Sequence, residues 1–271
     1  MKTNSQLRRQ ARLGLKGNWG MMALCYLLVL LATYVLILPV TMGSVIATIT
    51  SGTQTMTSSL IVNVWQILVA FAMLPASWML SVMCLRLVRG EYGQQQVRLG
   101  EVFEGYRYTN RVVGTYLLQT LVALAAIAIP FAAASFISLL DSRDGSTFYG
   151  TFWALMLIII AIVVFVSLRL SMIFYLIWDT QLGPWKVLKE SNRMMKGRCW
   201  KMFGLWLSFL GWAILAIFTL GIGFLWLVPY INASMGAFYD DIRAEEAAAA
   251  VEREAVEEQP AALDVEPQDQ E

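Results

Sequence analysis

The sequence predicts an all-α fold: a polytopic transmembrane helical bundle of about six spans, arranged as three hairpins that each follow a basic amphipathic interfacial segment. Apolar residues make up 58% of the 271 residues, and the mean hydropathy is +0.60, whereas a soluble domain is usually about 45–50% apolar. Apolar runs of roughly twenty residues recur, the length of helix that crosses ~30 Å of hydrocarbon. The ~10-residue alternating segments of a membrane β-barrel do not occur.

Apolar runs of this length define a transmembrane domain at residues 21–240. The predicted spans are 21–41, 60–87, 112–140, 148–178, 202–220 and 224–239. The first span exceeds the ~7–15 residues of a signal-peptide core, so we expect it to be retained. The sixth has only 16 residues, about 24 Å of helix, with Pro229 inside it. Three arrangements therefore stay open: it spans a locally thinned bilayer, runs on past Asp240, or re-enters without crossing.

Basic amphipathic stretches precede all three predicted hairpins. Residues 1–20 form the first, in which apolar residues recur at every fourth position from Leu7, among five basic residues and no acidic one. A charged, aromatic stretch at 90–111 is the second, and 184–201 is the third. We expect these leads to be helical and to lie at the membrane surface.

A short sequence recurs at the start of the first and third hairpins. Lys16-Gly17-Asn18-Trp19 precedes one, and Lys196-Gly197-Arg198-Cys199-Trp200 precedes the other. Internal duplication would produce this similarity, and so would a shared preference for Lys and Trp at lipid headgroups. The sequence leaves both explanations open.

The distribution of lysine and arginine predicts that both chain ends face the cytoplasm. Sixteen of these residues lie in segments expected on one side of the membrane, against Arg143 alone on the other side. Positively charged connectors stay in the cytoplasm. The N-terminus is therefore predicted there, and six spans return the C-terminus to the same side.

Net charge divides at Asp240. Before it, 18 basic and 7 acidic residues give +11; from it onward, 12 acidic and 2 basic residues give −10. We therefore expect anionic lipid headgroups as partners of the body and repulsion of the acidic cytoplasmic tail at 241–271. The tail is predicted to be helical as far as Gln259 and disordered from Pro260. It could compete with lipid for basic surface, or recruit an unidentified membrane or basic protein.

The residues needed for most enzyme chemistry are missing. The sequence has no histidine, which removes the commonest general base and metal ligand as well as the Ser-His triad. Neither a phosphate-binding glycine loop nor a GxSxG motif occurs, and no carboxylate pair lies within the predicted spans. We predict no catalytic residue, no metal site, no cofactor and no nucleic-acid partner, and hence no enzyme.

Arg169 is the one ionisable residue well inside a predicted span. It precedes Asp179 by ten residues, about 15 Å along a continuous helix. An arginine at this depth costs at least ~2.5–3.5 kcal/mol on insertion, so it is a candidate functional charge. The structural alternative is that it snorkels, or bonds to Ser, Thr or a broken-helix carbonyl. A separate helix break is predicted at Gly221, Gly223 and Pro229.

Contacts with lipid headgroups are predicted for basic and tryptophan residues beside the first and fifth spans. These candidates are Arg12, Lys16, Trp19, Trp185, Lys186, Lys189, Arg193, Lys196, Arg198, Trp200 and Lys201. Small residues such as Gly204, Ser208 and Gly211 would let helices approach closely, either within one chain or in a homo-oligomer.

Several motifs resemble those of the domain of unknown function 975 family. The resemblance is carried by Ser191-Asn-Arg-Met-Met-Lys-Gly197, Leu207-Ser-Phe-Leu-Gly-Trp212, Leu220-Gly-Ile-Gly-Phe-Leu-Trp226, Pro229-Tyr230, Ala237-Phe-Tyr239 and Arg12-Leu-Gly-Leu-Lys-Gly-Asn-Trp19. It covers roughly residues 7–240, and the acidic tail departs from it. The resemblance implies an uncharacterised bacterial integral membrane protein of several spans, in the cytoplasmic membrane, with no established activity.

Two functions are consistent with these observations. The division of charge favours a non-enzymatic membrane scaffold or accessory protein with a lipid-contacting basic cytoplasmic face. The alternative is a small-solute transporter or channel that uses Arg169 and the broken helices, since such helices often mark substrate sites. Against it, the spans carry few polar residues and no carboxylate for proton coupling.

Overall fold

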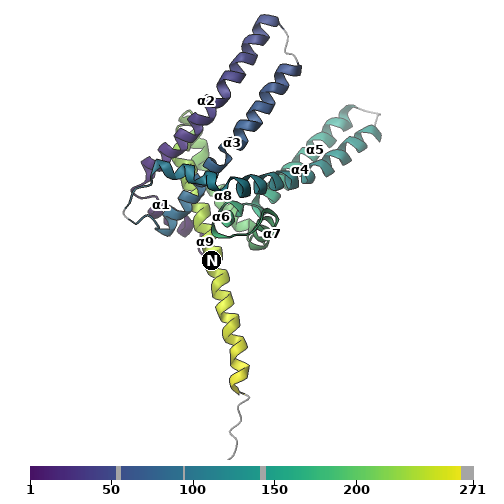
Figure 1. Ribbon diagram of the computed structural model, residues 1–271. Coiled ribbons are helices and arrows are strands. Elements are labelled where there is room, and N and C mark those ends of the chain that lie inside the picture. The colour runs from purple at the N-terminus through teal and green to yellow at the C-terminus, as the bar shows by residue number, and fades with distance from the viewer. Residues whose placement is uncertain (53–55, 94, 141–144, 264–271) are drawn as a thin grey trace, which may run out of the picture.

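The computed structural model describes residues 1–52, 56–93, 95–140 and 145–263, and within them it contains helices and no strands (Figure 1). In chain order the helices are α1 (Asn4–Gly14), α2 (Trp19–Ser51), α3 (Met56–Arg89), the 3-10 helix η1 (Leu99–Tyr108), α4 (Thr109–Leu140), α5 (Gly145–Arg169), α6 (Ile173–Asp179), α7 (Pro184–Met194), α8 (Cys199–Phe218) and α9 (Phe224–Leu263). The predicted all-α class is confirmed.

Five helical segments of the described chain are long and apolar enough to cross a membrane. They are Trp19–Thr50, Ser59–Arg89, Leu99–Ala132, Trp153–Asp179 and Cys199–Phe218. These segments correspond to the first five predicted spans. The sixth predicted span is the start of α9, which runs on past Asp240 as one helix, one of the three arrangements that the sequence left open.

Helix α9 also extends further than predicted at its other end. It passes through Pro260 and ends at Leu263, so the predicted change from helix to disorder at Pro260 is wrong. Alanine and glutamate dominate this part of the chain, and both have high helix propensity. The predicted disorder of residues 264–271 lies outside the described residues.

The polar, uncharged stretch between the first two predicted spans is helical as far as Ser51. Its hydroxyl groups explain why the helix continues. Thr48 donates to Ser44 O at 2.8 Å, and Thr50 donates to Ile46 O at 2.9 Å. Because these side chains bond to the preceding turn, their presence does not end the helix. The first hairpin is therefore longer than the two predicted spans.

The fourth predicted span, 148–178, is two helices rather than one. Helix α5 ends at Arg169, a turn covers 170–172, and α6 begins at Ile173. Ser191 Oγ donates to Arg169 O at 3.0 Å, which satisfies one of the unpaired carbonyls at the end of α5. The predicted continuous helix is wrong here, and the depth of Arg169 was inferred from that continuity.

A tight turn joins α8 to α9 at the predicted glycine break. Leu220 and Gly221 have positive φ angles of 53° and 87°, a conformation that glycine adopts readily and other residues rarely. Gly223 approaches α8 so closely that a Cβ would lie 2.9 Å from Ala216 Cα. The break is confirmed at both glycines. At Pro229 it is wrong, because α9 continues through it; a proline near the start of a long helix removes only one backbone bond.

The helices of the described chain form three units, each with a short lead helix and a pair of long helical segments. The units are α1–α3, η1–α6 and α7–α9. Each lead packs mainly against another unit: η1 against α3, α7 against α4 and α6, and α1 against α9 (Figure 1). The first lead thus packs on the last unit, which closes the three units into a cycle.

The first and third leads share one backbone geometry. Helices α1 and α7 begin and end 180 residues apart, and so do the starts of α2 and α8. In the connecting turns, Gly17 and Gly197 have φ angles of 90° and 78°. A preference for Lys and Trp at headgroups does not specify helix lengths or turn geometry. The structure therefore favours an internal repeat as the origin of the recurring sequence.

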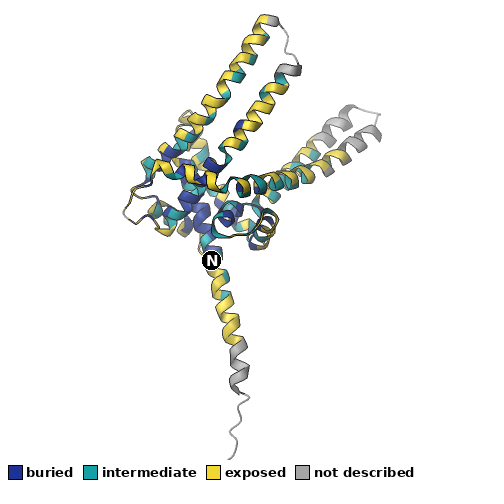
Figure 2. Cartoon of the chain, in the orientation of Figure 1, coloured by how far each residue is buried: buried dark blue, intermediate teal, exposed yellow. Residues whose placement is uncertain are grey.

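The three units meet in one region, which we call the base, where the buried residues gather (Figure 2). Trp78, Tyr175, Phe238 and Tyr239 are at most 1% exposed there. The α2–α3 and α4–α5 hairpins diverge from the base as separate arms with many exposed apolar side chains (Figures 1 and 2). Exposed apolar surface of this extent is expected of arms that contact lipid.

The apolar faces of α1 and α7 belong to the core of the base. Leu7 and Ala11 on α1 are 0% exposed, and Val187 and Met194 on α7 are at most 1% exposed. Helix η1 differs, because its Phe103 is 71% exposed. The amphipathic pattern of α1 and α7 is therefore satisfied by the protein itself.

Candidate functional site

One charged residue from each of α3, α6 and α9 meets the others at the base. Arg89 donates to both carboxylate oxygens of Asp179, at 2.8 and 2.6 Å, and to Asp240 Oδ1 at 2.7 Å. The three side chains are 26%, 15% and 24% exposed. A guanidinium fork suits this arrangement because it can bond to two planar carboxylates at once. We call Arg89, Asp179 and Asp240 the charge junction.

Hydrogen bonds beside the charge junction hold the same three helices together. Trp78 Nε1 on α3 donates to Phe174 O on α6 at 2.8 Å, and Tyr175 Oη on α6 donates to Asn232 O on α9 at 2.9 Å. The rings of Tyr175 and Tyr239 stack with their centroids 5.5 Å apart. The centre of the base is thus filled by packed and paired side chains.

A second charged group fixes η1 on α3. Arg86 donates to Glu101 at 3.0 Å and to Glu91 at 3.1 Å, and its guanidinium lies 4.7 Å from the centre of the Tyr92 ring. The Tyr92 hydroxyl donates to Glu101. Burial and this hydrogen bond raise the pKa of Tyr92 above its ordinary value. The group therefore anchors the lead of the second unit.

Acidic residues of α9 neutralise part of the basic surface of α7 and α8. The ion pairs are Arg193–Glu246 at 3.2 Å, Arg198–Glu245 at 3.4 Å and Lys201–Asp241 at 3.8 Å. Arg193 also pairs with Glu190 at 2.6 Å, and these hydrogen bonds lower the pKa of Glu190. Three of the predicted lipid contacts are therefore occupied by the start of the acidic segment.

The other predicted lipid contacts lie at or near the surface. Trp185 and Trp200 are 67% and 82% exposed. The exposed basic residues are Arg12, Lys16, Lys186, Lys189 and Lys196. Trp19 is half-buried. The structure gathers these residues on the two leads and the helix starts that follow them, but it does not bring them to one point.

Arg169 lies at the edge of the base, on a groove between the second unit and α7. The groove has a volume of about 470 Å³ and is also lined by Phe165, Trp185 and Lys189. Arg169 Nη1 donates to Asn192 Oδ1 at 2.8 Å, and its guanidinium lies 5.1 Å from the Phe165 ring. Its Nε is buried without a hydrogen-bond partner. Placement at the C-terminus of α5 also favours a positive charge.

Sequence reasoning missed the charge junction. It used Asp179 only to estimate the depth of Arg169, and it counted Arg89 only among the basic residues that predict membrane orientation. One signal was available in the sequence. The second predicted span ends near Arg89, and the fourth and sixth end next to Asp179 and Asp240, which carry the opposite charge. Within the described residues, no group of three or more thiol or carboxylate side chains could hold a metal ion.

The span-length apolar helices and the charged base define an α-helical, polytopic membrane protein. More particularly, the chain belongs to the family described as "Protein of unknown function (DUF975)", whose model matches residues 1–246. The match includes all three units and ends at Glu246, within the acidic segment of α9. No curated protein and no solved structure matches the chain.

Proposed function

We propose that this protein is a non-enzymatic membrane accessory or scaffold protein whose base rests on the anionic surface of the bacterial cytoplasmic membrane. The observation that carries this proposal is the pairing of α9 carboxylates with basic residues of α7 and α8 that would otherwise face lipid headgroups. The acidic segment and anionic lipid then compete for the same cations. The length of α9 beyond the base leaves its exposed part free to meet another protein.

The charge of the base supports lipid contact. Exposed lysines and tryptophans on the leads have the composition of membrane-interface anchors. Each Lys or Arg near an anionic surface contributes about 1 kcal/mol. Because Arg193 and Arg198 are paired with glutamates, the attraction of the base to an anionic membrane is reduced by up to about 2 kcal/mol.

The competition can be tested by freeing these two arginines. Full-length protein is reconstituted in vesicles of phosphatidylcholine and phosphatidylglycerol, extracted with its surrounding lipid in polymer particles, and the ratio of the two lipids is measured. We expect the E245Q/E246Q variant to capture more phosphatidylglycerol than the wild type. The matched control is E252Q/E254Q, which removes equal charge from the exposed part of α9. An equal ratio in all three proteins would contradict the competition.

The orientation of both chain ends toward the cytoplasm is part of the proposal, and the distribution of lysine and arginine supports it. Single cysteines are placed at Ser51 and at Glu254, in a variant with Cys199 replaced by serine. In intact cells, a membrane-impermeant thiol reagent is expected to label position 51 and not position 254. The reverse pattern would contradict this orientation.

A small-solute transporter is the second candidate, and one observation favours it. Arg169 carries a buried, unpartnered Nε beside a groove and is the last residue of α5, and broken helices often form substrate sites. Two observations weigh against it: Arg169 already bonds to Asn192, and the centre of the base is packed. The Arg169→Leu variant described below distinguishes the two roles.

A further inference from the structure

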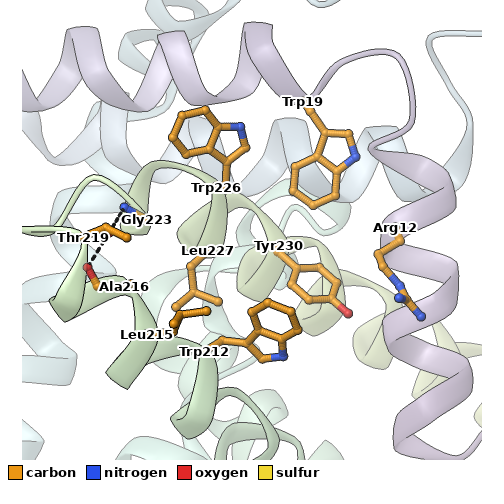
Figure 3. Close-up of a pocket in the computed structure, with 10 residues that line it drawn as sticks. All are labelled: Arg12, Trp19, Trp212, Leu215, Ala216, Thr219, Gly223, Trp226, Leu227 and Tyr230. Carbon is orange, nitrogen blue, oxygen red and sulfur yellow. Dashed lines mark hydrogen bonds between the residues drawn. The ribbon is translucent and has the colours of Figure 1, made fainter.

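A groove lies between α1, α8 and α9, and its lining, drawn in Figure 3, includes neither Arg169 nor any residue of the charge junction. Its volume is about 370 Å³, within the ~300–1,000 Å³ typical of ligand sites. Trp19, Trp212, Trp226 and Tyr230 form its aromatic walls, and Arg12 stands at one end. Such a combination of apolar walls and a terminal cation suits an amphipathic anion.

The end of the groove away from Arg12 is lined by uncharged residues of the turn between α8 and α9. There, Gly223 N donates to Thr219 Oγ1 at 2.9 Å, and Thr219 Oγ1 donates to Ala216 O at 2.7 Å (Figure 3). The turn between α8 and α9 thus satisfies its own polar groups. Apart from Arg12, the residues that line the groove are uncharged, so this part of it offers an apolar wall with no competing charge.

The opposite end carries positive charge without an internal partner. Arg12 is exposed and has no ion pair within the described residues. Arg8 lies one turn before it on the same face of α1, and Arg8 Nε is buried without a hydrogen-bond partner. One further turn back, Asn4 Oδ1 is also buried and unpartnered, although Asn4 Nδ2 reaches Lys201 O on α8 at 3.5 Å.

Buried polar atoms are nearly always hydrogen-bonded, so unpartnered ones indicate a missing ligand or solvent. Here they lie on the face of α1 that continues into the groove. The tyrosine hydroxyl of Tyr230 points toward the Arg12 side of the groove (Figure 3). The donors that line this end are therefore the Arg12 guanidinium and the Tyr230 hydroxyl, and the Arg8 guanidinium lies one helical turn away. Guanidinium groups are well suited to binding phosphate.

We propose that this groove holds one anionic glycerophospholipid. Its phosphate lies between Arg8 and Arg12, and an acyl chain lies along Trp212, Leu227 and Trp226. The proposal rests on the proposed membrane location but not on the diffuse contact of the other basic residues with lipid. In contrast to that diffuse contact, the groove would hold a single lipid molecule that is retained at a defined place. This lipid site also gives α1 a second role, because the same helix closes the cycle of units.

Native mass spectrometry of the full-length protein, after reconstitution with phosphatidylglycerol and mild detergent extraction, counts the retained lipids. We expect one phosphatidylglycerol per chain in the wild type. In the R8Q/R12Q variant we expect binding about 30-fold weaker, which corresponds to two charge contacts of about 1 kcal/mol each. The matched control K186Q/K189Q removes two exposed lysines from α7 and is expected to keep the retained lipid.

A second variant tests the groove without changing charge. Leu215 lines the groove and is 56% exposed, so L215W narrows it from its open side with little effect on the core. We expect loss of the retained lipid while the Trp fluorescence spectrum shows a folded protein. Retention in L215W, or equal loss in K186Q/K189Q and R8Q/R12Q, would overturn the proposal.

The source of the phosphate is distinguished by competition and by lipid charge. Glycerol phosphate in the buffer is expected to leave the retained lipid in place, whereas displacement by it would indicate a soluble phosphate ligand. Reconstitution with phosphatidylcholine alone is expected to give no retained lipid. If the lipid ratio in the E245Q/E246Q experiment changes while no single lipid is retained, this site is wrong and the proposed function stands. If one lipid is retained and that ratio does not change, the competition is wrong and this site stands.

Discussion

Replacing Arg89 with glutamine should destabilise the whole base, because Arg89 forms the ion pairs with both carboxylates of the charge junction. Asp179 and Asp240 would remain close together, 15% and 24% exposed, without their shared cation. Removing one member of a fully buried pair costs about 3–5 kcal/mol, and an exposed pair contributes at most about 1 kcal/mol. The partial exposure of this junction places the expected cost between these, at about 2–3 kcal/mol.

The free energy of unfolding can be followed by Trp fluorescence during denaturation in mixed micelles, since the rings of Trp78 and Trp178 lie 6.4 Å apart in the core. Arg89→Lys should lower the free energy of unfolding, but by less than Arg89→Gln does, because an ammonium group keeps the charge and loses the bidentate geometry. Arg253→Gln, an exposed residue on α9, is the matched control and should leave stability unchanged within about 0.5 kcal/mol.

A triple variant isolates the cause of the loss. The R89Q/D179N/D240N variant has none of the three charges of the junction. Because the effects of neighbouring residues on the free energy of unfolding are not additive, we expect it to regain most of the stability lost in R89Q. If the triple variant is no more stable than R89Q, the loss comes from packing of the arginine side chain and not from uncompensated carboxylates. No loss in R89Q would refute the reasoning altogether.

Three further outcomes are expected. Arg169→Leu should cost about 1–2 kcal/mol through the lost bond to Asn192 and should leave uptake of small anions by reconstituted vesicles unchanged; abolished uptake at unchanged stability would support the transporter. Gly105→Ala should destabilise the protein by about 1–3 kcal/mol in the same denaturation assay, because its Cβ would lie 2.3 Å from Pro75 O; an unaltered stability would contradict this close packing. The pKa of Glu190, measured by carboxyl NMR, should lie below its ordinary value and rise in Arg193→Gln. Because the folded pKa is the lower one, the stability from this pair is present above the ordinary glutamate pKa and is lost as pH falls through the folded pKa.

The spans could be predicted because the requirement that sets them is local. A helix must present about twenty apolar residues to hydrocarbon, and composition alone reveals that. The helix ends could not be predicted equally well. Thr48 and Thr50 bond to their own helix although threonine also favours loops. The break after Arg169 carries no glycine or proline, so no local signal marks it.

The charge junction depends on neighbours that are distant in the sequence. Arg89 and Asp240 are 151 residues apart, and the sequence around either residue does not indicate that the other is its partner. The sequence did show an excess of acid after Asp240 and of base before it. It could not show that Glu245 and Glu246 pair with Arg198 and Arg193, because that requires α9 to pass beside these arginines.

The amphipathic leads present an ambiguity that sequence patterns cannot resolve, since lipid and protein interiors attract the same apolar face. A substitution of Leu7 tests whether the apolar face of α1 contacts lipid or the protein interior. Leu7 is 0% exposed and packs in the core of the base, whereas Leu13 on the same helix is 61% exposed. We therefore expect Leu7→Ala to cost about 2–5 kcal/mol, the range for large-to-small core substitutions, and Leu13→Ala to cost less than about 1 kcal/mol.

The comparison also tests the closed cycle of units, because α1 packs mainly on α9, at the far end of the chain. If α1 served only as a membrane-surface helix, neither substitution would alter unfolding in micelles. If it closes the cycle, Leu7→Ala should lower the stability of the whole base, and the fluorescence of Trp78 and Trp178 should report that loss although neither residue belongs to α1. A loss restricted to α1, with both tryptophans unaffected, would show that the three units fold independently.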